Sequence, residues 1–377
     1  MKKGNLIQLA LILNLLGGIL YSCALEDKIF KENLSVDVKC IKHADTFFSK
    51  MTSYAKLETN NQCILDKIQS LKIIDNKILV LNKDKIFVFD LKGKYLYKID
   101  KRGKGHGEYL DIRDFTLRDS KYYIMSGKQE SLLCYNEDNI FVGEYPLGNG
   151  YEHFEFVNDD LIFLSSENNN RLMYNFVLYD IKKKTIIKKY FPFKKTQSFS
   201  FSDFSAFCGK DDNHFYVTNA FDNSIYSLCI DSIANEINFS FNTALQLPED
   251  YEEINFFDLY KQTSNKNVVR YIKKYHSTTN YYYITYSLFD NHGVSPYLSR
   301  ISKKKKETIS IALNDEVHKN FPYFGKVSLF VDDNTFVTVK NAEDIIYVNK
   351  HFGNDIKKMI EVKETDNPVV FFYKLKE

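Results

Sequence analysis

The sequence predicts an all-β fold, a six-bladed β-propeller with a short helical insertion between blades four and five. Two observations support this class: one strand pattern recurs six times along the chain, and segments near both ends could complete a shared blade. In each copy, apolar runs rich in β-branched and aromatic residues alternate with turns of Asp, Asn and Gly, which are strand and hairpin signals. A repeat of ~40–50 residues with several strands and no helix is typical of a propeller blade.

The repeats can be followed in order. The first three copies have three apolar runs each, at 78–81, 86–89 and 95–97, at 122–125, 132–135 and 140–142, and at 161–164, 176–179 and 186–187. Copies four to six show two runs each, at 215–217 and 225–228, at 282–284 and 297–298, and at 336–338 and 345–348. The turns that follow begin at Asp90, Asn136, Asp180, Asp231, Ser302 and Asn349.

The spacing of these turns places the insertion and the ring closure. Only the interval from Asp231 to Ser302 is unusually long, and its segment 247–262 has a helix-friendly composition after a proline. A final strand is expected to begin after Asn367-Pro368. The segment 54–57, before the first copy, is free to pair with it, which would leave few open sheet edges.

The N-terminus predicts secretion and a lipid anchor. Lys2 and Lys3 precede an apolar stretch from residue 6 to residue 20, which is shorter than the roughly 20 residues of a spanning helix. Leu20-Tyr21-Ser22-Cys23 resembles a bacterial lipobox, which would make Cys23 the acylated first residue of the mature protein. We expect a signal peptide at 1–22, a tether and N-terminal segment at 23–50 and the propeller at 51–377.

Charge and cysteine usage narrow the partners. The chain has a formal charge of +2 and becomes neutral once the two signal lysines leave, so nucleic acid is not expected as a partner. Beyond Cys23 the cysteines are odd in number and show no CxxC spacing, which favours buried thiols with at most one or two disulfides. These residues are Cys40, Cys63, Cys134, Cys208 and Cys229.

The run from Lys98 to Tyr109, KIDKRGKGHGEY, resembles the junction between the first two blades in six-bladed β-propeller lipoproteins of gut bacteria, a family distantly similar to NHL-repeat propellers. Leu57-Glu58-Thr59, residues 223–226 and Asp366-Asn367-Pro368-Val369 fit the same family. His106 stands where that family commonly has proline. The resemblance implies the fold and an envelope location, while members of the family generally have no assigned molecular function.

Few side chains suggest a ligand. The junction glycines are dense and basic, but no helix is predicted after them as a phosphate loop requires, so we expect them to serve chain geometry. Arg102, His106 and Tyr109 remain candidate ligand-binding residues. No hydrolase elbow, HExxH motif or metal-type histidine spacing occurs, and the acidic pairs before second strands suit turn chemistry, so neither a metal nor a cofactor is expected.

Two functions follow from these observations. The first is a non-catalytic binding or assembly module that offers a propeller face to a glycan, a peptide or an envelope protein. The lipid on Cys23 would hold it at the outer membrane, either in the periplasm or exposed at the surface. The second is a hydrolase or lyase acting on polysaccharide or peptide at the channel mouth. The second function requires Asp, Glu, His or Arg from several blades to meet on one face.

Overall fold

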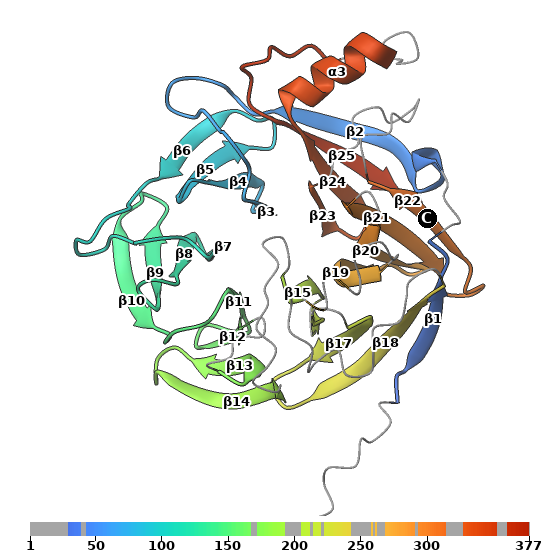
Figure 1. Ribbon diagram of the computed structural model, residues 1–377. Helices are drawn as coiled ribbons and strands as arrows, with labels where there is room; N and C mark the ends of the chain where they lie inside the picture. Colours follow the sequence, from blue (N-terminus) through green and yellow to red (C-terminus); the bar gives the residue numbers. More distant parts are fainter. Residues whose placement is uncertain are drawn as a thin grey trace, which may run out of the picture.

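Six sheets surround a common axis in the computed structural model of the chain, and apart from one parallel pair in blade four their strands are antiparallel (Figure 1). The structure describes residues 29–38, 43–166, 172–192, 205–211, 214–219, 222–242, 258, 261, 268–290, 293–313, 327–352 and 360–376. In every sheet one edge strand lies nearest the axis and the last lies at the rim. The predicted six-bladed β-propeller is confirmed.

The first three blades are built from consecutive strands. Blade one contains β3 (Ser70–Ile74), β4 (Lys77–Asn82), β5 (Lys85–Asp90) and β6 (Tyr95–Ile99). Blade two contains β7 (Asp114–Arg118), β8 (Lys121–Ser126), β9 (Ser131–Asn136) and β10 (Phe141–Pro146). Blade three contains β11 (His153–Phe156), β12 (Leu161–Ser165), β13 (Tyr174–Asp180) and β14 (Thr185–Pro192).

Two of the other three blades, four and six, include a strand from the N-terminal segment. Blade four contains β15 (Phe207–Lys210), β16 (Phe215–Val217), β17 (Ser224–Leu228) and β18 (Ile233–Phe241), and β1 (Glu32–Val36) pairs in parallel with β18. Blade five contains β19 (Val268–Ser277), β20 (Tyr281–Asp290), β21 (Gly293–Ser302) and β22 (Thr308–Ala312). Blade six contains β23 (Val327–Asp332), β24 (Thr335–Lys340), β25 (Val369–Leu375) and β2 (Phe48–Lys56), which follows the short 3-10 helix η1 (Ala44–Thr46).

The hydrophobic core is divided among the contacts between blades. Six clusters of buried apolar side chains are present, and each joins two neighbouring blades. Ile78 and Phe87 of blade one, for example, pack with Val337 and Val370 of blade six. Strand alternation supplies the two apolar faces that each blade needs. Many of the tyrosines lie in these clusters, and Tyr122 and Tyr135 are examples of fully buried tyrosine side chains.

Ring closure joins the two ends of the chain as the sequence predicts. β2 pairs antiparallel with β25, with Lys56 opposite Val369 and Phe48 opposite Leu375. Asn367 reinforces the join, because its buried side chain accepts from the Leu65 N–H at 2.8 Å and donates to the Glu58 carbonyl at 2.7 Å. Closure therefore rests on a strand pair and on an amide placed at the start of the last strand.

One predicted strand is wrong. Residues 345–348 lie in an α-helix, α3 (Ala342–Phe352), at the rim of blade six (Figure 1). Ala342, Ile345 and Val348 are buried at helical spacing, whereas Tyr347 is 54% exposed. The third strand of blade six is β25, which follows the helix.

The structure bears only in part on three other sequence predictions, which concern the inserted helix, the N-terminal segment and the cysteines. The expected helix at 247–262 lies outside the described residues except for Asp258 and Lys261, which are both helical. β1 shows that residues assigned to the tether belong to a blade. Cys63, Cys134 and Cys208 are buried free thiols and Cys229 is half-buried, while Cys23 and Cys40 lie outside the described residues. Within the described part of the chain, no helix is long and apolar enough to cross a membrane.

Candidate functional site

The inner strands bring ionisable side chains from five blades to the propeller axis. Lys72 lies on β3 between Leu71 and Ile73, which both pack toward blade six. Strand alternation therefore turns Lys72 toward blade two. By the same rule Phe115 packs toward blade one, and Asp114 faces blade three. The strands β3, β7, β11, β15 and β19 each contribute at least one ionisable side chain, so charge collects at the axis.

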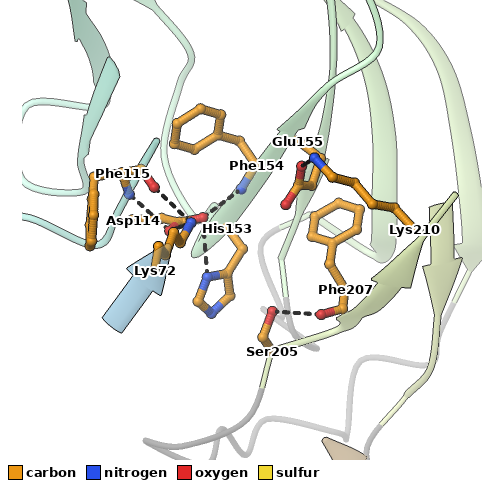
Figure 2. Close-up of polar contacts among 9 residues, drawn as sticks. All are labelled: Lys72, Asp114, Phe115, His153, Phe154, Glu155, Ser205, Phe207 and Lys210. Atoms are coloured by element: carbon orange, nitrogen blue, oxygen red, sulfur yellow. Dashed lines mark hydrogen bonds and ion pairs between the residues drawn. The ribbon is translucent and has the colours of Figure 1, made fainter. Parts of the chain in front are cut away.

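Asp114 is the centre of a bonded cluster that joins three blades (Figure 2). One carboxylate oxygen accepts hydrogen bonds from the Lys72 ammonium at 2.7 Å and from the Phe115 N–H at 2.8 Å. The other oxygen accepts from the Phe154 N–H at 3.2 Å and lies 3.4 Å from Nδ1 of His153. Burial alone would raise the pKa of Asp114, but Lys72 and His153 outweigh it and hold that pKa well below its usual range.

A second ion pair lies beside the first, on blades three and four. Nζ of Lys210 is 3.5 Å from the Glu155 carboxylate, and Figure 2 shows this pair next to the Asp114 cluster. Both side chains are partly exposed, at 66% for Lys210 and 30% for Glu155, so the pair adds little stability. Its charges stay available to solvent at the axis.

Lys274, on β19, adds a third lysine to this group. Its ammonium is within electrostatic range of Lys72, Asp114 and Glu155, which come from three other inner strands. Burial is the main cause that lowers the pKa of Lys274, and the charge of Lys72 adds to it. We call the six side chains Lys72, Asp114, His153, Glu155, Lys210 and Lys274 the axial cluster.

The glycine junction places the three sequence-predicted site residues away from the axial cluster. Tyr109 is fully buried, and its hydroxyl lies 3.0 Å from the Asp84 carbonyl and 3.2 Å from the Lys101 N–H. Arg102 is exposed and forms an ion pair with Asp84 at 3.3 Å. His106 is exposed and packs its ring against Phe141 at 4.9 Å. The junction bridges Arg102 and Tyr109 through its backbone but does not gather the three side chains around one point.

Gly107 explains why this junction is rich in glycine. Its φ is +71°, a conformation that side chains rarely adopt, and a Cβ there would lie 2.6 Å from the Phe141 ring. The expected positive φ at the blade crossing is thus present at Gly107. The junction serves the chain path, and its main polar contacts are internal.

The acidic pairs before the second strands are used by turns and neighbouring cations. Asp159 pairs with Arg118 at 2.7 Å and Asp160 with Lys182 at 2.6 Å. The Asp332 carboxylate accepts from the Asn334 N–H at 2.8 Å, which is an Asx turn. Among the described residues no group of three or more His, Cys, Asp or Glu is placed to hold a metal ion.

Sequence reasoning missed the axial cluster because it located only the outer strands of each blade. Five of the innermost strands have only four to six residues, whereas β19 has ten, and polar residues interrupt the apolar runs that mark the other strands. A usable signal was present: Lys72, Glu155 and Lys210 each stand one to four residues before an Asp-containing turn. A charged residue recurring at that point marks the axis of the ring.

Five four-stranded sheets and one five-stranded sheet around an axis lined by charged residues define a six-bladed β-propeller. The chain belongs to the DUF4934 family, which is described as a domain of unknown function, because that family model matches residues 33–374. No curated protein matches the chain.

Two solved structures are similar over most of their length. A Bacteroides fragilis protein that is described as exported shares 18% identity and a TM-score of 0.71, covering 92% of this chain and 100% of its own. A member of the DUF4221 family from Bacteroides vulgatus shares 12% identity and a TM-score of 0.54, covering 86% of this chain and 97% of its own. At these identities the likeness concerns the fold.

Proposed function

We propose that this protein is an exported, lipid-anchored binding module of the cell envelope, which holds a glycan, a peptide or an envelope protein at the propeller axis. The axial cluster carries the proposal, because five blades contribute ionisable groups to one place and several of them face solvent. Propellers commonly bind ligands where loops and inner strands meet the axis. The exported relative and the signal-like residues 1–22 support the location.

The state of Asp114 favours binding over acid–base catalysis. Its two oxygens are occupied by an ammonium group, two backbone N–H groups and His153. A general acid or base needs a pKa near the working pH and a free position for the proton, whereas this pKa is held low. The carboxylate therefore acts as a fixed structural charge.

The test of binding uses the purified protein on glycan and peptide arrays, with Lys210→Met as the axial variant and Lys104→Met as a matched control. Lys104 is exposed on the junction and outside the axial cluster. We expect at least one class of ligand to bind, with Lys210→Met weakening it by about 5-fold or more and Lys104→Met leaving it unchanged. Equal effects of the two variants, or no ligand in either array, would contradict the proposal.

The anchor is tested separately, by metabolic labelling with a fatty acid that carries an alkyne. We expect the wild-type protein and a Cys229→Ala control to carry the label and to fractionate with membranes. Cys23→Ala should lose the label and be released as a folded soluble protein, because no helix among the described residues could span a membrane. Continued membrane association of Cys23→Ala would refute an anchor at that residue.

One contact favours a second candidate, a hydrolase or lyase acting on polysaccharide or peptide. The Asp114 carboxylate lies 3.4 Å from Nδ1 of His153, and a carboxylate that orients a histidine is a common general-base arrangement. Incubation with the array ligands, followed by mass spectrometry, distinguishes the two functions. Turnover that is abolished by His153→Ala would select the enzyme, whereas intact ligands would leave the binding module.

A further inference from the structure

Lys274 differs from the other axial lysines in having no counter-ion among the described residues. Lys72 donates to the Asp114 carboxylate and to the Phe115 carbonyl, and Lys210 faces the Glu155 carboxylate. The Lys274 ammonium group has neither a hydrogen bond nor an ion pair within the described part of the chain, and Cys208, Glu155 and Asp114 act on it only through longer-range electrostatics. A half-buried ammonium group in this position has lost part of its hydration without a protein partner in return.

The backbone at this point holds Lys274 close to the neighbouring blade. Gly209 on β15 stands where a Cβ would lie 2.4 Å from the Tyr275 carbonyl oxygen, so the two inner strands approach as closely as only glycine allows. Lys210 directly follows Gly209 on β15, and Lys274 directly precedes Tyr275 on β19. The close approach brings two cations to adjacent edges of the axis.

The charge balance indicates which ligand group would fit. The lysines and acids of the axial cluster comprise three ammonium groups and two carboxylates, so one further negative charge would balance these five groups. A single carboxylate supplies that charge and accepts several charge-assisted hydrogen bonds.

We propose that Lys274 anchors a carboxylate group of the ligand at the propeller axis, with Lys210 and Lys72 beside it. This inference rests on the proposed binding function and names the ligand chemistry. A bound carboxylate would restore the counter-ion that Lys274 lacks. It would also raise the pKa of that ammonium group, because an opposite charge favours the charged form.

The experiment titrates the purified protein with glucuronate, with N-acetylalanine and with glucose as the uncharged control, monitored by calorimetry. The variants are Lys274→Met, which keeps the length of the side chain, and Arg102→Met as a matched control at the glycine junction. We expect at least one carboxylate to bind and glucose not to bind. Lys274→Met should weaken that binding by about 10-fold or more, and Arg102→Met should leave it unchanged.

A second readout separates a ligand anchor from a structural lysine. Without ligand, Lys274→Met should unfold at the same temperature as the wild type or a higher one, because it removes an unpaired ammonium group. Carboxylate should raise the unfolding temperature of the wild type only. The inference would be overturned if neither carboxylate binds, or if glucose binds as tightly as the carboxylates do. It would also be overturned if Lys274→Met leaves carboxylate binding unchanged. If the arrays yield only uncharged ligands, the binding function survives and this inference falls.

Discussion

Replacing Asp114 with Asn tests whether the axial cluster holds the blades together. The substitution keeps the shape of the side chain but removes the charge that joins blades one, two and three. Breaking a buried ion pair costs about 3–5 kcal/mol. Lys72 is 26% exposed and can regain water, so we expect the lower end, about 3 kcal/mol. At about 2 °C per kcal/mol for a chain of this size, the unfolding temperature should fall by about 6 °C.

The pH dependence of this loss follows from the lowered pKa of Asp114. Because the folded state favours the ionised carboxylate, its stabilisation is present above the unfolded pKa of about 3.9 and is lost as the pH falls toward the folded value. The difference between wild type and Asp114→Asn should therefore shrink as the pH falls below about pH 4. Urea unfolding above and below this pH measures it.

A double-mutant cycle with Lys72→Met isolates the ion pair itself. Lys72→Met leaves Asp114 with its two backbone donors and His153, so the single variant should cost less than Asp114→Asn. The two substitutions should couple by about 1–3 kcal/mol, as expected for groups in one network. A coupling below about 0.5 kcal/mol, or a loss under about 1 kcal/mol for Asp114→Asn, would refute the cross-linking role.

Three further variants, two of them with a control variant, test other parts of the ring by urea unfolding. Gly209→Ala should cost about 1–3 kcal/mol because its Cβ meets a backbone carbonyl of β19, while Gly143→Ala, with nothing within 4 Å, should stay within about 0.5 kcal/mol. Asn367→Ala should cost about 3 kcal/mol by removing three hydrogen bonds at the closure, and an unchanged stability would contradict that role. Ile345→Ala should cost about 2–5 kcal/mol and Tyr347→Ala almost nothing; similar losses would favour a strand over α3.

The repeat and its closure could be predicted because they depend on local patterns. Strands two and three of each blade are buried on both faces, so they read as continuous apolar runs such as Ile78–Leu81. The closing strand was visible because Asn367-Pro368 marks its start and leaves few residues after it. The helix α3 was misread, because four apolar residues in a row fit a strand as well as about one turn of helix.

The axial cluster was not predicted, because its members are far apart in the sequence and the charged positions before the Asp-containing turns were not recognised as a repeat. Lys72, Asp114 and His153 meet only when three blades stand side by side, and each alone looks like an ordinary exposed residue. The glycine junction shows the opposite case, a motif that is visible in the sequence and whose ligand-binding role stays a prediction. Arg102, His106 and Tyr109 were conspicuous as a motif, yet the motif serves the path of the chain between blades.

The pairing of β2 with β25 also sets the order of events during synthesis. Lys56, the last residue of β2, pairs with Val369, which is synthesised much later. At about 5–20 residues per second that interval lasts tens of seconds. During this interval the ring cannot close, because β2 lacks its partner strand β25 and the long-range contact between the two ends of the chain has not formed. The strand pair that closes the ring can therefore form only after residues 369–375 have been made.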